Sequence, residues 1–176
     1  MHRLTSTSTK LVGQNGKQLA VIVDRDGTAA SCRVRPDDSS KISWAAFNAA
    51  LPFDALVPEV AALCRSFREG VALIMTSGRA EGDHPGDRRR FFLMKDWLYK
   101  YRDELPVDYL FMRSGGDQRR DSIVKKEIYK GFIEPYFDVR FAIDDRPQIV
   151  DLWRELGIPV LAVTDPEIDP PILRSI

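Results

Sequence analysis

Short apolar runs alternate with amphipathic stretches along most of this chain, and this alternation constrains its fold more than any other feature of the sequence. Apolar runs with few charges predict strands buried on both faces, and the amphipathic stretches between them predict helices that cover those faces. The predicted strands are 19–24, 71–76, 108–113, 139–143 and 159–163, and the predicted helices are 57–69, 87–103, 121–135 and 147–156. The sequence therefore predicts an α/β domain with a central, mainly parallel, five-stranded sheet and helices on both faces.

The length of 176 residues, 44% of them hydrophobic, favours one domain large enough to bury a core. Residues 1–18 are expected to form an N-terminal arm or hairpin that turns at Asn15-Gly16, and residues 19–176 are expected to form the domain. The first ten residues are polar and lack the apolar segment of a signal peptide or membrane span. A cytoplasmic location without a membrane partner is therefore expected.

Overall charge identifies no partner, because Lys and Arg total 26 and Asp and Glu also total 26. Nucleic-acid binding would therefore need a local patch. The runs Arg88-Arg89-Arg90 and Arg119-Arg120 could supply one, although such runs are more often solvated helix faces. Cys32 and Cys64 form no C-x-x-C pair, which argues against a structural zinc site.

Two aspartates lie two residues apart where the first predicted strand ends, in Asp24-Arg25-Asp26-Gly27-Thr28. Residues i and i+2 of an extended backbone point to the same side, so both carboxylates are expected to face one crevice. A metal ion or a phosphoryl group could lie between them. Strands also end in Asp and Gly where a turn or helix cap is needed, so this motif alone leaves a structural role open.

Three later segments bring polar residues to the ends of other predicted strands, or next to them. Thr76-Ser77-Gly78-Arg79 supplies a hydroxyl, a flexible turn and a guanidinium that suit phosphate oxygens. A buried Asp144 would need a cation as partner, whereas Asp145 could cap the helix that starts at Pro147. Lys125 adds a positive charge. Ligands in such folds bind outside the carboxyl ends of the strands, so these groups are expected to lie together.

In order and placement, the groups Asp24/Asp26, Ser77, Lys125 and Asp144/Asp145 resemble the four motifs of haloacid-dehalogenase-superfamily phosphatases. More narrowly, residues 19–163 resemble the 3'-phosphatase domain of phage polynucleotide kinase/phosphatase. The matching segments are Ser77-Gly78-Arg79, Arg113, Gly116-Asp117, Val124-Lys125, Phe137-Asp138-Val139, Ile143-Asp144-Asp145-Arg146 and Trp153-Arg154. The resemblance implies a Rossmann-like fold with a minimal cap. It also implies a metal-dependent polynucleotide 3'-phosphatase that removes the terminal phosphate from DNA or RNA ends through an aspartyl-phosphate intermediate, in end repair.

The resemblance further implies roles for individual residues. Asp24 would attack phosphorus, and Asp26 would protonate the leaving oxygen and later activate water, which requires a raised pKa. Mg²⁺ is the expected cofactor, held by Asp24, by Asp26 through its backbone carbonyl, and by the pair Asp144 and Asp145. The residues expected to bind the substrate or its phosphate are Thr28, Arg35, Ser77, Gly78, Arg79, Arg113 and Lys125.

Two features bear on the choice of substrate. The sequence has no G-x-x-x-x-G-K-[ST] loop, so no 5'-kinase activity is expected, and a separate polynucleotide kinase or ligase is the expected partner. Arg25 makes the first motif similar to that of histidinol-phosphate and heptose-bisphosphate phosphatases in the same superfamily. A small-molecule phosphatase acting on sugar phosphates or histidinol phosphate is therefore the alternative, and a binding module that senses 3'-phosphate ends without chemistry is a third hypothesis.

Overall fold

The computed structural model describes residues 2–3, 10–32, 43–67 and 70–163. Its main sheet has the strand order β1-β6-β5-β2-β7-β8. The strands are β1 (His2–Arg3), β2 (Gln18–Asp24), β5 (Ala72–Ala80), β6 (Tyr109–Arg113), β7 (Phe137–Asp144) and β8 (Val160–Ala162). All neighbouring pairs are parallel except β1 with β6. The predicted five-stranded parallel sheet is confirmed, and β1 adds a two-residue antiparallel edge.

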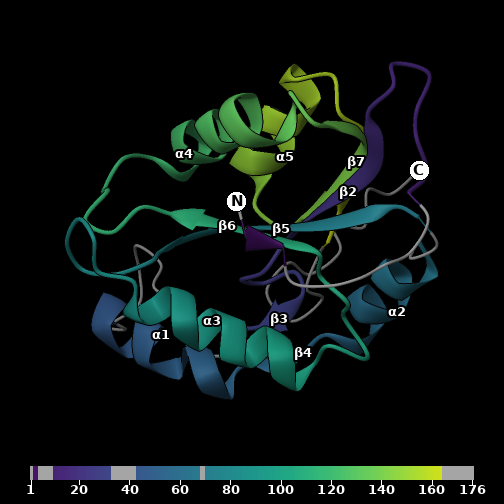
Figure 1. The fold of residues 1–176 in the computed structure, drawn as a ribbon. Coiled ribbons are helices and arrows are strands. Elements are labelled where there is room, and N and C mark those ends of the chain that lie inside the picture. The colour runs from purple at the N-terminus through teal and green to yellow at the C-terminus, as the bar shows by residue number, and fades with distance from the viewer. Residues whose placement is uncertain (1, 4–9, 33–42, 68–69, 164–176) are drawn as a thin grey trace, which may run out of the picture.

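Helices cover both faces of this sheet, as Figure 1 shows. The helices are α1 (Trp44–Ala50), α2 (Pro58–Ser66), α3 (Arg89–Lys100), α4 (Asp121–Ile128) and α5 (Pro147–Glu155). The first three lie on one side of the sheet, and α4 and α5 lie on the other. The stretch predicted as one helix over 121–135 is α4 followed by the π-helical segment η2 (Tyr129–Ile133).

Strand β2 shows why the strands are apolar throughout. Val21 and Val23 point into the core formed with α2 and α3, whereas Ala20 and Ile22 point into the core formed with α4, η2 and α5. Alternate residues of a strand face opposite sides of the sheet, so a strand covered by helices on both sides needs apolar residues at every position. This double burial fixes the position of Asp24, the last residue of β2.

The segment between β2 and α2 contains only short elements among its described residues. They are β3 (Ala30–Ser31), α1, the 3₁₀-helix η1 (Leu51–Phe53) and β4 (Ala55–Leu56). Strands β3 and β4 pair as a separate two-stranded antiparallel sheet. Ser43 caps α1, because its hydroxyl accepts a hydrogen bond of 3.2 Å from the Ala46 N–H. In the described residues of this segment the cap over the fold is thus minimal, as expected. Arg35, one of the expected binding residues, lies outside the described residues.

The expected turn at Asn15-Gly16 is present. Gly16 has a φ of 75°, a left-handed conformation that glycine adopts without steric cost, and the Lys17 N–H donates to the Asn15 side chain at 3.0 Å. The Lys17 ammonium in turn donates to the Glu134 carbonyl at 2.7 Å, which fixes this turn against η2. Separately, none of the helices in the described ranges has both the length and the apolar character needed to cross a membrane.

Candidate active site

The carboxyl ends of β2 and β7 bring Asp24 and Asp144 together. The two strands are parallel neighbours with Val23 opposite Ile143, so the aspartate that follows each of these residues emerges at the same edge of the sheet. Both aspartates are buried, with 3% of Asp24 and none of Asp144 exposed. This edge is where ligands bind in open parallel sheets.

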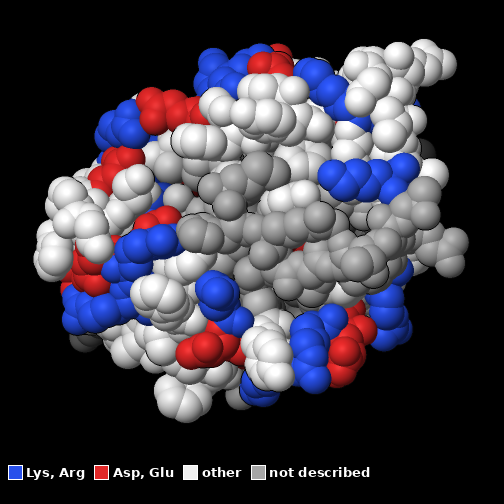
Figure 2. Space-filling model, viewed as in Figure 1, with Lys and Arg blue, Asp and Glu red and all other residues white. Residues whose placement is uncertain are grey.

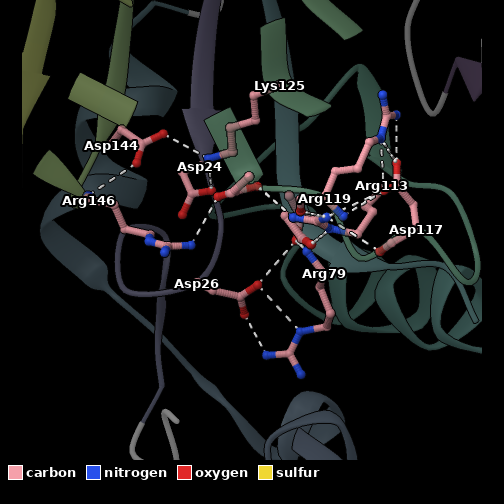
Figure 3. A network of polar contacts seen from close by, with 12 residues as sticks. Asp24, Asp26, Arg79, Arg113, Asp117, Arg119, Lys125, Asp144 and Arg146 are labelled. Carbon is pink, nitrogen blue, oxygen red and sulfur yellow. Dashed lines mark hydrogen bonds and ion pairs between the residues drawn. The ribbon is translucent and has the colours of Figure 1, made fainter. Parts of the chain in front are cut away.

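Lys125 bridges the two aspartates from α4 (Figure 3). Its Nζ donates to Asp24 Oδ1 at 2.6 Å and to Asp144 Oδ2 at 2.9 Å, and the side chain is fully buried. Burial lowers the pKa of Lys125, but Asp144 and Asp24 outweigh that effect and hold the pKa above its ordinary value. The Trp153 indole N–H also donates to Asp144 Oδ2, at 3.3 Å. The lysine is therefore a fixed buried cation.

Asp145 joins these two aspartates in an acidic cluster, which we define as Asp24, Asp144 and Asp145. One carboxylate oxygen from each lies within 4.8 Å of the others, and the Thr28 hydroxyl donates to Asp145 at 3.2 Å. A donor set made of carboxylate oxygens suits a divalent cation such as Mg²⁺.

Burial raises the pKa of Asp24 well above its ordinary value. Lys125 is the next largest influence and lowers the pKa of Asp24, but burial together with the carboxylates of Asp144 and Asp145 outweighs it. A cation at the acidic cluster would remove the cost of ionising Asp24. The electrostatics of the site therefore fit a bound divalent metal.

Asp26 lies in a second, separately neutralised cluster. Its carboxylate accepts hydrogen bonds from Arg25 Nη1 at 2.5 Å, from Arg79 Nη2 at 2.6 Å and from the Ser77 hydroxyl at 3.1 Å. Burial raises the pKa of Asp26, but Arg25 and Arg79 outweigh it and hold the pKa below its ordinary value. The shift is opposite in direction to the raised pKa expected from the sequence, because Arg25 and Arg79, rather than Asp24, are the dominant charged neighbours of Asp26.

Arg25 does not face the acidic cluster. Its guanidinium donates to Asp54 at 2.8 Å and to the Leu51 carbonyl at 2.9 Å, and it lies 4.6 Å from the centre of the Trp97 ring. The side chain is fully buried. It therefore ties the first motif to η1 and α3. Arg25 is the residue that makes the first motif similar to that of metabolite phosphatases. In this structure its side chain makes buried structural contacts.

Ser77 and Arg79 lie on an irregular end of β5, where the register with β6 shifts between Ser77 and Ala80. The Arg79 N–H donates to the Ser77 hydroxyl at 3.1 Å. The Arg79 guanidinium packs 3.7 Å from the centre of the Phe47 ring and donates to the Phe47 carbonyl at 2.7 Å. Helix α1 thereby holds the arginine against Asp26.

Asp121 is a site residue that the sequence analysis missed. One of its oxygens accepts from Arg113 at 3.4 Å and the other accepts from Arg146 at 3.1 Å. It also approaches Gly78 so closely that a Cβ there would lie 2.2 Å from Asp121 Oδ1. Arg113 donates to the Gly78 carbonyl at 2.6 Å. Asp121 is one helical turn before Lys125, a spacing that puts both on one face of α4 and could have identified it.

Most of the predicted site residues converge at this edge of the sheet, in two clusters rather than one. Asp24, Lys125, Asp144, Asp145 and Thr28 belong to the acidic cluster and its contacts, whereas Asp26, Ser77 and Arg79 meet in the second. Gly78 and Arg113 contact each other and lie next to Asp121, and Arg35 lies outside the described residues.

The arginine runs are largely neutralised within the chain. Their ion pairs are Arg88 with Glu81, Arg89 with Asp83 and Asp87, Arg90 with Asp83, and Arg119 with Asp117 and Glu127. Figure 2 shows basic and acidic side chains next to one another along the lower and left edges of the face that it draws. This pattern matches the interpretation of the runs as solvated faces.

Comparisons with known proteins agree with this geometry. Residues 18–167 match the family model described as "Polynucleotide kinase PNKP phosphatase domain". Two solved structures, of a Pnkp1/Rnl/Hen1 complex and of the Pnkp1/Rnl/Hen1 RNA repair complex, contain similar chains. The first is 30% identical with a TM-score of 0.66, covering 90% of this chain and 50% of that one. The second is 29% identical with a TM-score of 0.70, covering 92% and 47%.

A curated viral relative matches over a shorter stretch. A segment of 67 residues, 38% of this chain, is 33% identical to the "Putative bifunctional polynucleotide kinase/RNA ligase" of Autographa californica nuclear polyhedrosis virus. That segment is 10% of the viral protein. This chain therefore spans about half the length of the solved chains and a small part of the viral one.

Proposed function

The chain belongs to the family of polynucleotide kinase PNKP phosphatase domains in the haloacid dehalogenase superfamily, and from this premise we propose that it is a Mg²⁺-dependent polynucleotide 3'-phosphatase. Its substrate would be the terminal 3'-phosphate of a DNA or RNA strand, and its product a 3'-hydroxyl end that a ligase or polymerase can use. The observation that carries the proposal is the acidic cluster around Lys125, with Asp24 and Asp144 both bonded to one buried ammonium.

Asp24 is the proposed nucleophile. One of its oxygens forms a bond to phosphorus as the bond between phosphorus and the 3' oxygen breaks, and Asp26 gives a proton to that leaving oxygen. Water then attacks phosphorus and passes its proton to Asp26, and the bond between Asp24 and phosphorus breaks to release phosphate. Splitting the displacement in two avoids a single slow hydrolysis.

The lowered pKa of Asp26 sets a requirement on this mechanism. A carboxylate paired with Arg25 and Arg79 carries no proton to donate. Arriving phosphate oxygens would compete with Asp26 for the Ser77 hydroxyl and the Arg79 guanidinium. We infer that this exchange raises the pKa of Asp26 and prepares it as the acid.

Lys125 and Ser77 would hold the non-bridging phosphoryl oxygens, and Thr28 would orient Asp145. Mg²⁺, held by Asp24, Asp144, Asp145 and the Asp26 backbone carbonyl, would supply the positive charge that stabilises the transferring phosphoryl group. Arg113 and Arg146, joined by Asp121, are suited to neighbouring phosphates of the strand, since guanidinium groups bind phosphate in a bidentate manner.

The partner proposal rests on relatives. The viral relative's name includes a polynucleotide kinase and an RNA ligase, and the solved relatives belong to complexes named for RNA repair. This chain has no G-x-x-x-x-G-K-[ST] loop. We therefore propose that 5' phosphorylation is carried out outside this chain, and that a separate polynucleotide kinase or ligase is its partner.

The test is phosphate release from a panel of substrates at equal Mg²⁺. The panel holds 3'-phosphorylated DNA and RNA oligonucleotides, nucleoside 3'-monophosphates, sugar phosphates and histidinol phosphate. Oligonucleotides should have the highest kcat/KM, and Asp24→Asn should abolish release from every substrate because it removes the nucleophile without changing the size of the side chain. A preference for sugar phosphates by orders of magnitude would establish the small-molecule alternative instead. Oligonucleotide binding by the unaltered chain without any phosphate release in Mg²⁺ would indicate a binding module.

A further inference from the structure

Trp44 differs from the other two tryptophans of the chain in its exposure. Trp97 and Trp153 are 2% and 0% exposed, whereas Trp44, the first residue of α1, is 68% exposed. Burial of a large aromatic side chain is favourable by a few kcal/mol, so leaving an indole in water forgoes that stabilisation. Tryptophan is enriched at binding surfaces, so an exposed tryptophan close to a reaction site is a candidate for ligand contact.

A short series of contacts connects Trp44 to the phosphate-binding side of the active site. The Trp44 ring packs edge-to-face on Phe47, with ring centres 5.7 Å apart and an angle of 82° between the planes. Phe47 in turn carries the Arg79 guanidinium 3.7 Å from its ring centre, and Arg79 binds Asp26. The Trp44 indole is thus connected through Phe47 to the Arg79 guanidinium, which binds Asp26.

The edge-to-face geometry leaves the indole able to stack. A T-shaped contact covers at most one face of the Trp44 ring, so the Phe47 contact leaves the opposite face uncovered. Phe47 also fixes the side chain, because both residues lie on one turn of α1. An anchored aromatic ring with an open face is what single-strand binding proteins present to a nucleobase.

We propose that Trp44 stacks on the nucleobase of the terminal nucleotide while its 3'-phosphate occupies the site at Asp24. The inference rests on the proposed function and adds to it the residue that would favour a polynucleotide end over a sugar phosphate, which has no base. Every base has a π-face, so stacking would favour nucleotide ends of DNA and RNA alike without selecting a sequence.

The kinetic test compares two single-stranded oligonucleotides with a 3'-phosphate, one ending in thymidine and the other in an abasic tetrahydrofuran unit. For the unaltered chain, kcat/KM should be higher on the thymidine end. Trp44→Ala should lower kcat/KM on the thymidine end about 5- to 150-fold, as expected for the loss of one stacked base. The loss should come mainly from a higher KM, and kcat/KM should fall to its value on the abasic end. Trp44→Phe should retain most of the difference. Tyr99→Ala, which truncates another exposed aromatic side chain, 69% exposed on α3, is the matched control.

A binding measurement without turnover separates this inference from the proposed function. Because the other two tryptophans are buried, the indole that stacks should dominate quenching of intrinsic fluorescence by an oligonucleotide. In Asp24→Asn, the 3'-phosphorylated thymidine strand should quench the emission, the abasic strand should quench it less, and Trp44→Phe in the same background should remove the difference.

Equal losses on both strands, or quenching that survives Trp44→Phe, would overturn the stacking role. If Trp44 instead served a protein interface, its substitution would leave both oligonucleotide measurements unchanged. That result would also overturn the stacking role. Absence of phosphate release by the unaltered chain would instead reject the proposed function, and the quenching result would still decide whether Trp44 binds a base.

Discussion

Lys125 Nζ lies 2.6 Å from Asp24 Oδ1, although the two residues are 101 positions apart in the sequence. The contact joins α4 to the end of β2 and leaves both groups out of water. A buried ion pair is costly to form, so its value here lies in what it fixes rather than in stability. It holds one Asp24 oxygen and leaves the other to act.

Replacing this lysine tests that relationship. Lys125→Met keeps most of the side-chain volume but leaves Asp24 and Asp144 without their shared cation. We expect kcat to fall at least ~100-fold, as when one preorganised charge is removed from an active site, and the free energy of unfolding to fall by ~3–5 kcal/mol in the absence of metal. Turnover with the preferred oligonucleotide and urea unfolding measure the two effects. Lys126→Met, at the exposed neighbouring position, is the control. A kcat near that of the unaltered chain would contradict the proposed role.

Metal binding should be visible as thermal stability. With Mg²⁺ at 100 times its dissociation constant, the gain is ~2.7 kcal/mol, which for a domain of this size raises Tm by about 5–10 °C. Asp145→Asn should lose most of this rise, because it removes one of the three clustered carboxylates. Asp96→Asn, on the exposed side of α3, should keep it. Equal Mg²⁺-dependent shifts in both variants would exclude the acidic cluster as the metal site.

The strands and the strand-end positions of Asp24, Ser77 and Asp144 could be predicted, since apolar runs and parallel topology determine them. The side-chain pairing of Asp26 could not. The rule that residues i and i+2 face the same side holds within extended backbone, but β2 ends at Asp24 and Asp26 turns toward Arg25 and Arg79. The expected rise in the pKa of Asp26, which was attributed to Asp24, is therefore outweighed by Arg25 and Arg79.

Phe47 and Asp54 were missed for a different reason. They lie in a segment without a motif, and their importance depends entirely on contacts distant in sequence. Asp54 meets Arg25 across 29 residues, and the Phe47 carbonyl meets Arg79 across 32. Asp121, in contrast, could have been predicted as a site residue from its helical spacing to Lys125 alone.

The Arg25 contacts predict a pH-dependent contribution to stability. Arg25→Met leaves Asp26 and Asp54 buried with less positive charge, so we expect a loss of ~3–5 kcal/mol at pH 7. Although burial opposes it, the pKa of Asp26 is lowered in the folded protein. The stabilisation is therefore complete above the unfolded value of about 3.9 and declines as the pH falls below it.

Urea unfolding of the unaltered chain and Arg25→Met at pH 7 and near pH 3 measures this dependence. The penalty should be smaller at the lower pH, because the carboxyl groups left by the substitution can take up protons. Adding Asp54→Asn to Arg25→Met should recover part of the loss, since one uncompensated charge is removed. A penalty that is independent of pH would mean that packing against Trp97, rather than charge, is what Arg25 provides.

Gly78 tests whether Asp121 matters through the arginines that it joins. A Cβ at this position would lie 2.2 Å from Asp121 Oδ1, so Gly78→Ala must displace that carboxylate from Arg113 and Arg146. If these arginines bind neighbouring phosphates, KM for a 3'-phosphorylated oligonucleotide should rise about 10- to 100-fold, the value of one or two charged hydrogen bonds. A nucleoside 3'-monophosphate has no neighbouring phosphate, so its KM should change much less. Gly131→Ala, where nothing lies within 4 Å of the added Cβ, is the matched control. Equal effects on both substrates would show that the substitution disturbs the Ser77 turn itself rather than the arginines beyond it.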